Sequence, residues 1–331
     1  MNSRLLLLDV GVLSNLLHFV NGRPTDEPAP IIRPAKPLEI PLAVRLILIG
    51  SGVQVDDEQV TEFLTQAPTR GIDLSRLWVA EQSGRVTIAA LPVQSPGRTM
   101  LIFAPRAASR TQESVMSRLI DAVCLEANQH NIHLAQALFD PIDDALQRVY
   151  TACGFVRMAE LLYLQGTPRS TTELPPLATR QHLLNYSLES HGLFARTILA
   201  SYQDSLDCPA LNGLRDIEDI MDGHKASGQF DPSMWYLLLE NDTPLGVLLL
   251  ACTAAQTVEL VYLGLTPLAR GRRIGQMLMQ HAMAITARTE CPKLSLAVDA
   301  RNIPALKLYY RSGLSRTGVK LAYMRDLRGM G

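Results

Sequence analysis

The residues best suited to carry chemistry form a short basic segment in the last quarter of the chain. Arg270, Arg272 and Arg273 fall within four positions, directly before a helical pattern that begins near Ile274. No acidic residue occurs between positions 260 and 289. The first turn of a helix has backbone N–H groups without partners, and its dipole favours an anion. The segment therefore has the local charge and backbone of an anion site.

Two glycines in the same segment, Gly271 and Gly275, lack a Cβ, so a ligand can approach the backbone closely. Successive N–H groups of such a turn can form a nest for phosphate oxygens. We predict a phosphate or pyrophosphate cradle at a strand–loop–helix junction; the alternative is a solvated basic loop before an ordinary helix. The sequence has neither a GxxxxGK(S/T) P-loop nor a clean GxGxxG fingerprint, which disfavours the nucleotide-binding folds.

Composition argues against several other classes of site. The chain has 331 residues, 47% of them apolar, and a formal net charge of -1, so it gives no general reason to expect nucleic acid or an anionic membrane as a partner. Its five cysteines form no CxxC pair and its seven histidines show no HExxH spacing, which predicts neither a disulfide framework nor a metal site. This cysteine usage fits a reducing cytoplasm, and the length suits two domains.

The N-terminal region predicts no packed structure. The apolar stretch within residues 1–20 is interrupted by Asp9 and precedes no A-x-A-like cleavage site, which favours an amphipathic segment or an untidy translation start over a signal peptide. No apolar run approaches the ~20 residues of a membrane span. Residues 21–41 are rich in proline and predict an extended linker.

The second half of the chain alternates between strand and helix patterns, with Asn241-Asp242 as a hairpin signal between two strands. This order implies at least one parallel strand pair. The expected elements are a helix over 181–203, strands over 233–242, 244–253 and 257–265, a helix over 275–288, a strand over 293–300, a helix over 303–312 and a strand over 318–327.

The first half ends with the same series of elements. They are a strand over 99–105, a helix over 112–130, a strand over 132–140, a helix over 143–153 and a strand over 155–164. "LQRVYTACGF" and "ALKLYYRSGL" align Tyr150 with Tyr309 and Gly154 with Gly313. A distant duplication explains this match, and chance similarity of two helix ends is the alternative. The stretch 165–176 is rich in proline and threonine, and we take it as the domain boundary. We therefore predict an extension over 1–37 and domains over 38–165 and 166–331.

Two motifs of the second half together resemble the GCN5-related N-acetyltransferase (GNAT) superfamily. The segment from Arg270 to Gly275 is similar to its acyl-CoA pyrophosphate loop, Arg/Gln-x-x-Gly-x-Gly/Ala. "NIPALKLYYRSGL" is similar to its second signature, matching at Asn302, Ala305, Leu308, Tyr309 and Gly313. Arg273 replaces the usual middle glycine and Leu314 the usual phenylalanine. The cradle survives the first change if the φ angle of Arg273 is negative.

The resemblance covers residues 180–328 and implies an α/β fold of two tandem GNAT-like domains. Each would be a mixed, mostly antiparallel sheet with a central parallel strand pair flanked by helices. The first half resembles a degenerate copy, because its loop "APRAASRTQESV" has no glycine and retains only Arg106 and Arg110. A tandem layout with one active half is similar to that of mycothiol synthase.

The implied activity is direct transfer of an acetyl group from acetyl-CoA to a primary amine of a small molecule or a protein, without a metal, by a monomer or homodimer. The alternative is a non-catalytic acyl-CoA-binding or interaction protein. Residues that the resemblance assigns to the cofactor are Leu263, Gly264, Leu265, Arg270, Gly271, Arg272, Arg273, Ile274, Gly275 and Asn302. Leu263 would supply an oxyanion donor, Gly264 would mark a β-bulge, and Asn302 would bind pantetheine or simply cap its helix.

Glu259 and Tyr309 are the expected catalytic pair. A carboxylate suits removal of a proton from an amine of pKa near ~10, and a phenol of pKa near ~10 can protonate a departing thiolate. A solvent-facing glutamate and a packed tyrosine are the structural alternatives. For the acceptor we predict a pocket in the polar stretch after the first helix of this half, the alternative being an ordinary loop. Its residues would be Asp207, Cys208, Arg215, His224 and Trp235.

Overall fold

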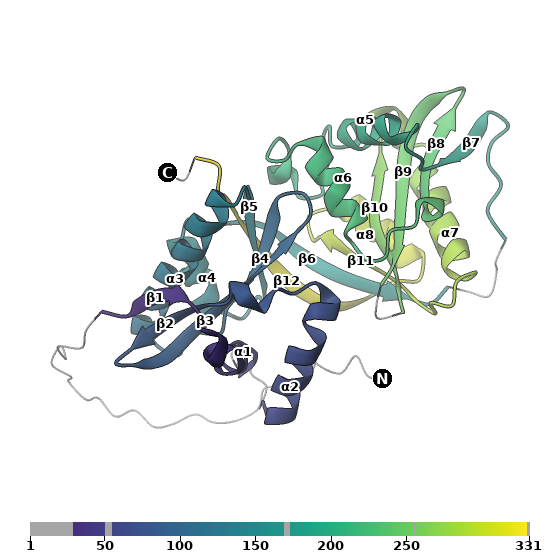
Figure 1. Cartoon of the computed structure of the whole chain (residues 1–331). Coiled ribbons are helices and arrows are strands. Elements are labelled where there is room, and N and C mark those ends of the chain that lie inside the picture. Colours follow the sequence, from purple (N-terminus) through teal and green to yellow (C-terminus); the bar gives the residue numbers. More distant parts are fainter. Residues whose placement is uncertain (1–28, 50–54, 169–172, 254–255, 330–331) are drawn as a thin grey trace.

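The computed structural model describes residues 29–49, 55–168, 173–253 and 256–329 of the chain. In this part of the chain, twelve strands form one continuous sheet, and helices cover both of its faces (Figure 1). The extreme N-terminal segment, for which we expected no signal peptide, lies outside the described residues. No helix among the described residues is long and apolar enough to cross a membrane.

The first half contains six strands and four α-helices within the described residues. In chain order they are β1 (Ile31–Pro34), α1 (Ile40–Ile49), α2 (Asp57–Gln66), β2 (Trp78–Gln82), β3 (Arg85–Ser95), β4 (Thr99–Phe103), α3 (Arg110–Gln129), β5 (Leu134–Phe139), α4 (Asp144–Ala152) and β6 (Val156–Gly166). Gly154, just after α4, has a φ of +75°, which lets the chain leave the helix in a left-handed turn.

The second half repeats this order from its own edge strand. Its elements are β7 (Gln181–Asn185), α5 (His191–Ser201), α6 (Ile217–Lys225), β8 (Trp235–Glu240), β9 (Thr243–Cys252), β10 (Val258–Leu265), α7 (Ile274–Thr286), β11 (Leu294–Asp299), α8 (Ile303–Arg311) and β12 (Ser315–Asp326). Asn241 and Asp242 both have positive φ, as the predicted hairpin turn requires.

The predicted fold class is confirmed. Each half has one parallel pair, β4 with β5 and β10 with β11, inside an otherwise antiparallel sheet. A core on the α3–α4 side of the first half and a core on the α7–α8 side of the second half contain most of the large buried side chains. Two smaller cores lie under α1–α2 and under α5–α6.

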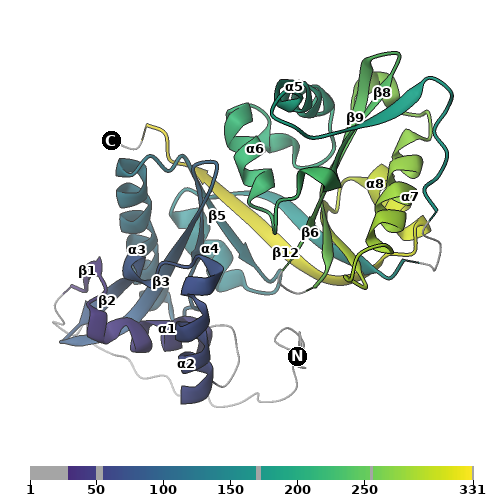
Figure 2. The same ribbon diagram turned by 45° about the vertical axis from the view of Figure 1, so that its right-hand side comes forward.

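The two halves exchange their last strands, which the sequence did not predict. The strand order runs β5-β12-β6-β11, so β12 of the second half pairs with β5 and β6 of the first. In return, β6 pairs with β11 along six residues. Figure 2 shows β12, in yellow, crossing from the second half into the first beside the teal β6. Each half is therefore completed by the other.

Two predicted elements need correction. The helix predicted over 181–203 begins only at His191, because Gln181–Asn185 pair with β8 as an edge strand. Within the predicted linker 21–41, Ile31–Pro34 form β1 against β2. In both places a tertiary strand pair overrides the local signal. The boundary predicted between residues 165 and 166 stays a prediction: β6 ends at Gly166, yet both of its partner strands, β11 and β12, belong to the second half.

Candidate functional site

A cavity of about 290 Å³ opens where β10 and β11 diverge. The two strands pair only at Val258 with Leu294 and at Glu259 with Ser295. Beyond that point their facing edges are free of each other, and the cavity lies between them. Its wall is built from β10 (260–265), β11 (296–298), the first turns of α8 and the turn after α5 (201–207).

A β-bulge in β10 lies between Leu260 and Tyr262, where the register with β9 shifts. The bulge predicted at Gly264 is therefore three residues too late. Gly264 has another function: a Cβ there would be 2.4 Å from Cε1 of Tyr262 and 2.6 Å from Oγ of Ser201. The Tyr262 hydroxyl and the Ser201 hydroxyl are hydrogen-bonded at 2.7 Å beside the cavity. Neither residue was identified from the sequence, although the tyrosine precedes a strand glycine.

Helix α7 begins without a side-chain cap. Its N-cap is Arg273, which makes no side-chain cap hydrogen bond. Within the described part of the chain, the backbone N–H groups of residues 271–276 have no acceptor. Four orphan N–H groups at a helix start, together with the helix dipole, make a site for an anion. This backbone fits the pyrophosphate group that the sequence predicts here.

The φ angle of Arg273 is +61°, so the stated condition of a negative φ is not met. The residue takes the left-handed conformation that the usual glycine would adopt, at a cost of roughly 1–2 kcal/mol. Gly271 also has a positive φ, of +74°. Left-handed residues on either side of Arg272 turn neighbouring N–H groups toward one concavity, so the cradle does not depend on the predicted angle.

The three arginines of the loop have different partners. Arg270 lines the cavity and donates to the carbonyl of Ser201 at 2.9 Å. Arg272 pairs with both carboxylate oxygens of Glu240 at 2.8 Å, at the end of β8. Arg273 has no ion-pair partner among the described residues. The backbone thus supplies more of the predicted anion site than the arginine side chains do.

Gly275 lines the cavity from the first turn of α7. A Cβ at this position would be 3.5 Å from the side chains of Leu265 and Leu308, an ordinary contact. The protein itself thus tolerates a methyl group here, and only a larger side chain would fill the space beside the free N–H groups. From the predicted cofactor set, Leu263, Gly264, Leu265, Arg270, Gly275 and Asn302 line the cavity, whereas Gly271, Arg272, Arg273 and Ile274 do not.

Tyr309 lies on α8 with its side chain in the cavity wall. It is 8% exposed, and its hydroxyl has no hydrogen-bond partner in the described ranges. Burial, and then the charge of Asp207, raises the pKa of Tyr309, so its phenol stays protonated at neutral pH. Asn302 caps α8 by accepting from the N–H of Ala305 at 3.3 Å, which satisfies the structural alternative predicted for it.

Glu259 lies beside the cavity rather than in its wall. It is the last residue of β10 paired with β11, and its carboxylate has no ion pair or hydrogen bond within the described residues. Burial raises the pKa of Glu259 above its usual value. A half-buried carboxylate without a cationic partner is suited to accept a proton, and the solvent-facing alternative does not describe it.

Among the predicted acceptor residues, Asp207 alone lines the cavity. Its Oδ1 accepts from the backbone N–H of Asp299 at 3.2 Å, and the N–H of Cys208 donates to Asp299 at 3.3 Å. Burial raises the pKa of Asp207 despite that hydrogen bond. Burial also raises the pKa of the Cys208 thiol to about 12, so it is not a thiolate nucleophile at neutral pH.

The other three predicted acceptor residues are packed behind the cavity. Trp235 is fully buried among Tyr186, Phe194 and Phe230, so the prediction that it binds the acceptor is wrong. The His224 ring stacks on Tyr262 at 5.3 Å. Burial, and then Arg215, lowers the pKa of His224 to about 4.

Arg215 donates to the carbonyl of Asp219 at 2.6 Å. Arg215 and His224 are half-buried and do not line the cavity, and His224 supports Tyr262 of its wall by stacking. A spacing pattern cannot separate such supporting residues from contacting ones, because both come from the same turn-rich stretch.

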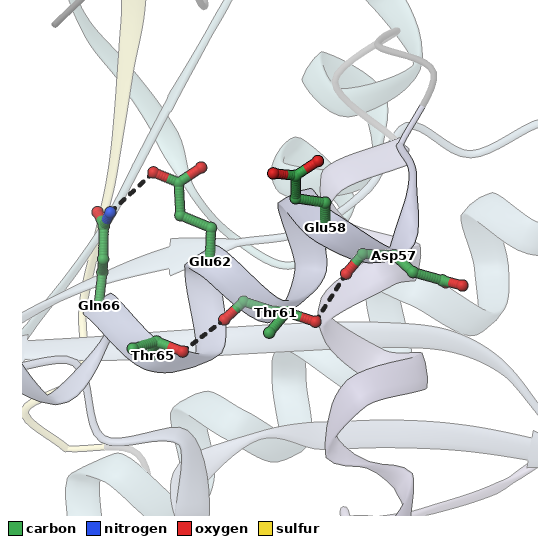
Figure 3. Close-up of a pocket in the computed structure, with 6 residues that line it drawn as sticks. All are labelled: Asp57, Glu58, Thr61, Glu62, Thr65 and Gln66. Carbon is green, nitrogen blue, oxygen red and sulfur yellow. Dashed lines mark hydrogen bonds between the residues drawn. The ribbon is translucent and has the colours of Figure 1, made fainter.

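A second hollow, of about 440 Å³, lies over α2 in the first half (Figure 3). All six side chains around it come from this one helix, and its hydroxyl and amide groups bond within the helix, as Thr61 does to the carbonyl of Asp57. It is an open helix face, and we assign no function to it. In the described ranges, no cluster of acidic, histidine or cysteine side chains is arranged to hold a metal ion.

Comparison with known proteins shows what this chain is similar to. Residues 202–314 match the model of the acetyltransferase (GNAT) family. Comparison with curated protein sequences yields no match. A solved GCN5-related N-acetyltransferase from Sphaerobacter thermophilus has a TM-score of 0.58 and 18% identity, over 90% of this chain and 96% of its own.

Two further solved structures show comparable similarity. The glucosamine N-acetyltransferase region of a fungal multi-domain GH3 β-N-acetylglucosaminidase has a TM-score of 0.56 and 13% identity, over 92% of this chain and 39% of its own. A tandem GNAT protein from the clavulanic acid biosynthesis pathway has a TM-score of 0.49 and 14% identity, over 90% of this chain and 98% of its own. At these identities the similarity of the solved structures concerns the fold.

Proposed function

We propose that this protein transfers an acetyl group from acetyl-CoA to a primary amine, because residues 202–314 match the model of the acetyltransferase (GNAT) family. The observation that carries the proposal is the uncapped start of α7, which opens beside a cavity between two diverging strands. A phosphate group is the natural partner for free N–H groups at a helix start. The divergence of β10 and β11 leaves room for an extended chain to run from that start toward Tyr309.

The thioester of acetyl-CoA supplies the activated acyl group, and the residues of the chain bind it and move the protons. The free N–H groups of 271–276 would hold the pyrophosphate, with Gly275 giving it access. Glu259 would accept the proton of the amine, directly or through one water, because its carboxylate lies beside the cavity. As the C–S bond breaks, Tyr309 would donate its phenolic proton to the sulfur.

Titration calorimetry with acetyl-CoA tests the donor half of this proposal. We expect saturable binding of one acetyl-CoA per chain; absence of binding would refute the proposal. Thiol release with a panel of amines then tests catalysis. The panel should include a polyamine, an amino sugar, an amino acid ester and a lysine peptide. A control without amine corrects for the half-exposed thiols of Cys208 and Cys252. Binding without release on every amine would favour the non-catalytic alternative.

A further inference from the structure

The strand exchange brings one residue of the first half to the site of the second. Strand β6 lies against β11, and Tyr163 of β6 is paired with Ala297 of β11. Ala297 lines the cavity. The neighbouring pair along the same strands joins Gln165 to Ser295, and Ser295 is in turn paired with Glu259. Side chains far upstream in the sequence therefore lie one strand away from the predicted catalytic glutamate.

Register places these side chains on one face of the sheet. Paired residues in neighbouring strands point to the same side, and residues two apart along a strand do so as well. Glu259, Ser295, Ala297 and Tyr163 therefore share a face. The alternate residues of β11 point to the other face, into the core under α7 and α8.

This face is open where the four residues lie. Ala297 is exposed although its strand is in the middle of the sheet. Ser295 and Ala297 carry small side chains, whereas Glu259 and Tyr163 stand on either side of them. Two strand spacings, about 10 Å, separate β10 from β6. Small side chains therefore lie between a carboxylate and an aromatic ring on this face, next to the cavity.

The Tyr163 side chain is not used by the rest of the fold. Its ring is half-buried, and its hydroxyl has no partner within the described residues. Burial, and then the charge of Glu259, raises the pKa of Tyr163, so the two groups are close enough to interact electrostatically. Leu161, two residues earlier in β6, lies on the same face and extends the apolar surface.

The first half has the reverse arrangement of sizes. The spacing of 159 positions that relates Tyr150 to Tyr309 also relates Leu138 to Ala297 and Tyr163 to Ala322. Leu138 of β5 is paired with Ala322 of β12. In the first half, the large side chain is Leu138, on the strand β5 that pairs in parallel with β4. In the second half, the corresponding strand β11 carries the small Ala297. The small side chain therefore lies on β11, and the aromatic ring paired with it is supplied by the first half.

We propose that Tyr163 is an acceptor-binding residue of the second half, and that the acceptor is a primary amine on an alkyl chain. The reacting nitrogen faces Glu259, and the alkyl chain crosses Ala297 and packs against the ring of Tyr163. The proposal rests on the acetyl transfer proposed above. It gives the first half a direct part in selecting the acceptor.

A two-part probe tests the proposal without knowledge of the natural acceptor. It is CoA whose sulfur carries an acetamide with an n-butyl group on its nitrogen, so that the butyl chain occupies the acceptor side. Calorimetry compares this conjugate with CoA alone. We expect the wild-type protein to bind the conjugate about tenfold more tightly than CoA, since four buried methylene and methyl groups contribute well over that factor at full burial.

Tyr163→Ala should lose this gain and leave the affinity for CoA unchanged. Tyr163→Leu, which keeps most of the volume, should retain part of it, and it serves if the alanine variant does not fold. Tyr310→Ala is the matched control: Tyr310 is 46% exposed on α8 and does not line the cavity. It should keep the full gain.

A gain retained in Tyr163→Ala, or no gain in the wild-type protein, would overturn the proposal. Failure of the wild-type protein to bind CoA itself would instead refute the proposed function, so the two failures are distinguishable. Thermal melting of each variant confirms that it is folded.

Discussion

The starts of α3 and α7 occupy the same place in the two halves and treat their N–H groups in opposite ways. At α3, Ser109 accepts from the N–H of Gln112 at 3.2 Å, and the Gln112 side chain accepts from the N–H of Ala108 at 2.8 Å. At α7, Arg273 supplies no cap and the N–H groups stay free. Helix α3 thus has a side-chain cap on its N-terminal turn, whereas α7 has none among the described residues.

The two matched tyrosines differ in the same way. Tyr150 is fully buried, and its hydroxyl donates to the carbonyl of Ile102 at 3.0 Å, with Phe139 stacked on its ring. Tyr309 faces a cavity with a free hydroxyl. The basic residues of the first loop are neutralised too, as Arg110 pairs with Glu113. The first half thus satisfies, within the protein, the Tyr150 hydroxyl and the Arg110 side chain, whose counterparts in the second half lie beside the cavity.

Among the substitutions that test the difference between the two helix starts, we expect the largest effect at Gly275. Gly275→Trp should weaken acetyl-CoA binding by at least about 100-fold, or about 2.7 kcal/mol, because the indole fills the space beside the free N–H groups. Gly275→Ala is the matched control and should bind nearly as the wild type. Calorimetry measures both, and circular dichroism checks folding. Tight binding by the tryptophan variant would place the pyrophosphate elsewhere.

Removal of the Tyr309 hydroxyl should impair catalysis, whereas removal of the Tyr150 hydroxyl should reduce only stability. Tyr309→Phe should lower kcat about 100-fold at unchanged acetyl-CoA affinity, because the leaving sulfur loses its proton donor. Tyr150→Phe should leave kcat unchanged and reduce the free energy of unfolding by about 1 kcal/mol, through loss of the bond to Ile102. Steady-state kinetics and urea unfolding measure the two effects. An equal kcat for Tyr309→Phe and the wild type would exclude it as the acid.

Glu259→Gln should lower kcat/KM by about tenfold, less than the tyrosine change, because Glu259 lies beside the cavity. In the wild type, activity should fall as the pH drops through the raised pKa of this carboxyl, and the variant should lack that acidic limb. The pH profile of kcat/KM, measured from about pH 5 to about pH 9, shows whether the acidic limb is present in the wild type and absent in the variant.

The same substitution should also change stability. A carboxyl whose folded pKa is raised contributes stability below its unfolded pKa, and that contribution is lost as the pH rises through the folded pKa. Glu259→Gln should therefore raise the Tm at neutral pH, and the difference should disappear in acid. A lower Tm at neutral pH would mean that the carboxylate has a stabilising partner.

The smallest effects are expected at the helix starts. Ser109→Ala should lower the free energy of unfolding by about 1 kcal/mol, because the N–H of Gln112 in α3 loses its cap. Arg273→Gly should raise it by about 1 kcal/mol, because glycine adopts a φ of +61° without strain. Denaturant unfolding of the two variants measures both. A destabilised Arg273→Gly variant would show that the arginine side chain contributes contacts that outweigh its backbone strain.

The sequence predicted the parts of the molecule that depend on local pattern. The strand–loop–helix order around Arg270–Gly275 and the helix with Tyr309 are present within one or two residues of their expected bounds. Local pattern also indicated that the first loop, without glycine, differs from the second. These features follow from spacing and turn chemistry, which act over a few residues.

Features set by long-range pairing were not predictable in this way. Nothing in Val156–Gly166 or Ser315–Asp326 distinguishes a strand that completes its own sheet from one that completes the other. The pairing of Arg272 with Glu240 and the burial of Trp235 likewise depend on segments that meet only in the folded chain. Tyr163 was missed for the same reason, since its neighbours lie in strands that begin more than ninety positions later.

The exchanged strands also determine how the protein responds to being cut. A break in the connection between β6 and β7 would leave β6 inserted between β12 and β11, and β12 inserted between β5 and β6. The two fragments would remain interlocked, each holding a strand that the other needs. The second fragment expressed alone would expose two unpaired edges in its sheet, a state prone to aggregation. The chain is thus a natural candidate for a split reporter, with recovery of acetyl-CoA binding as its signal.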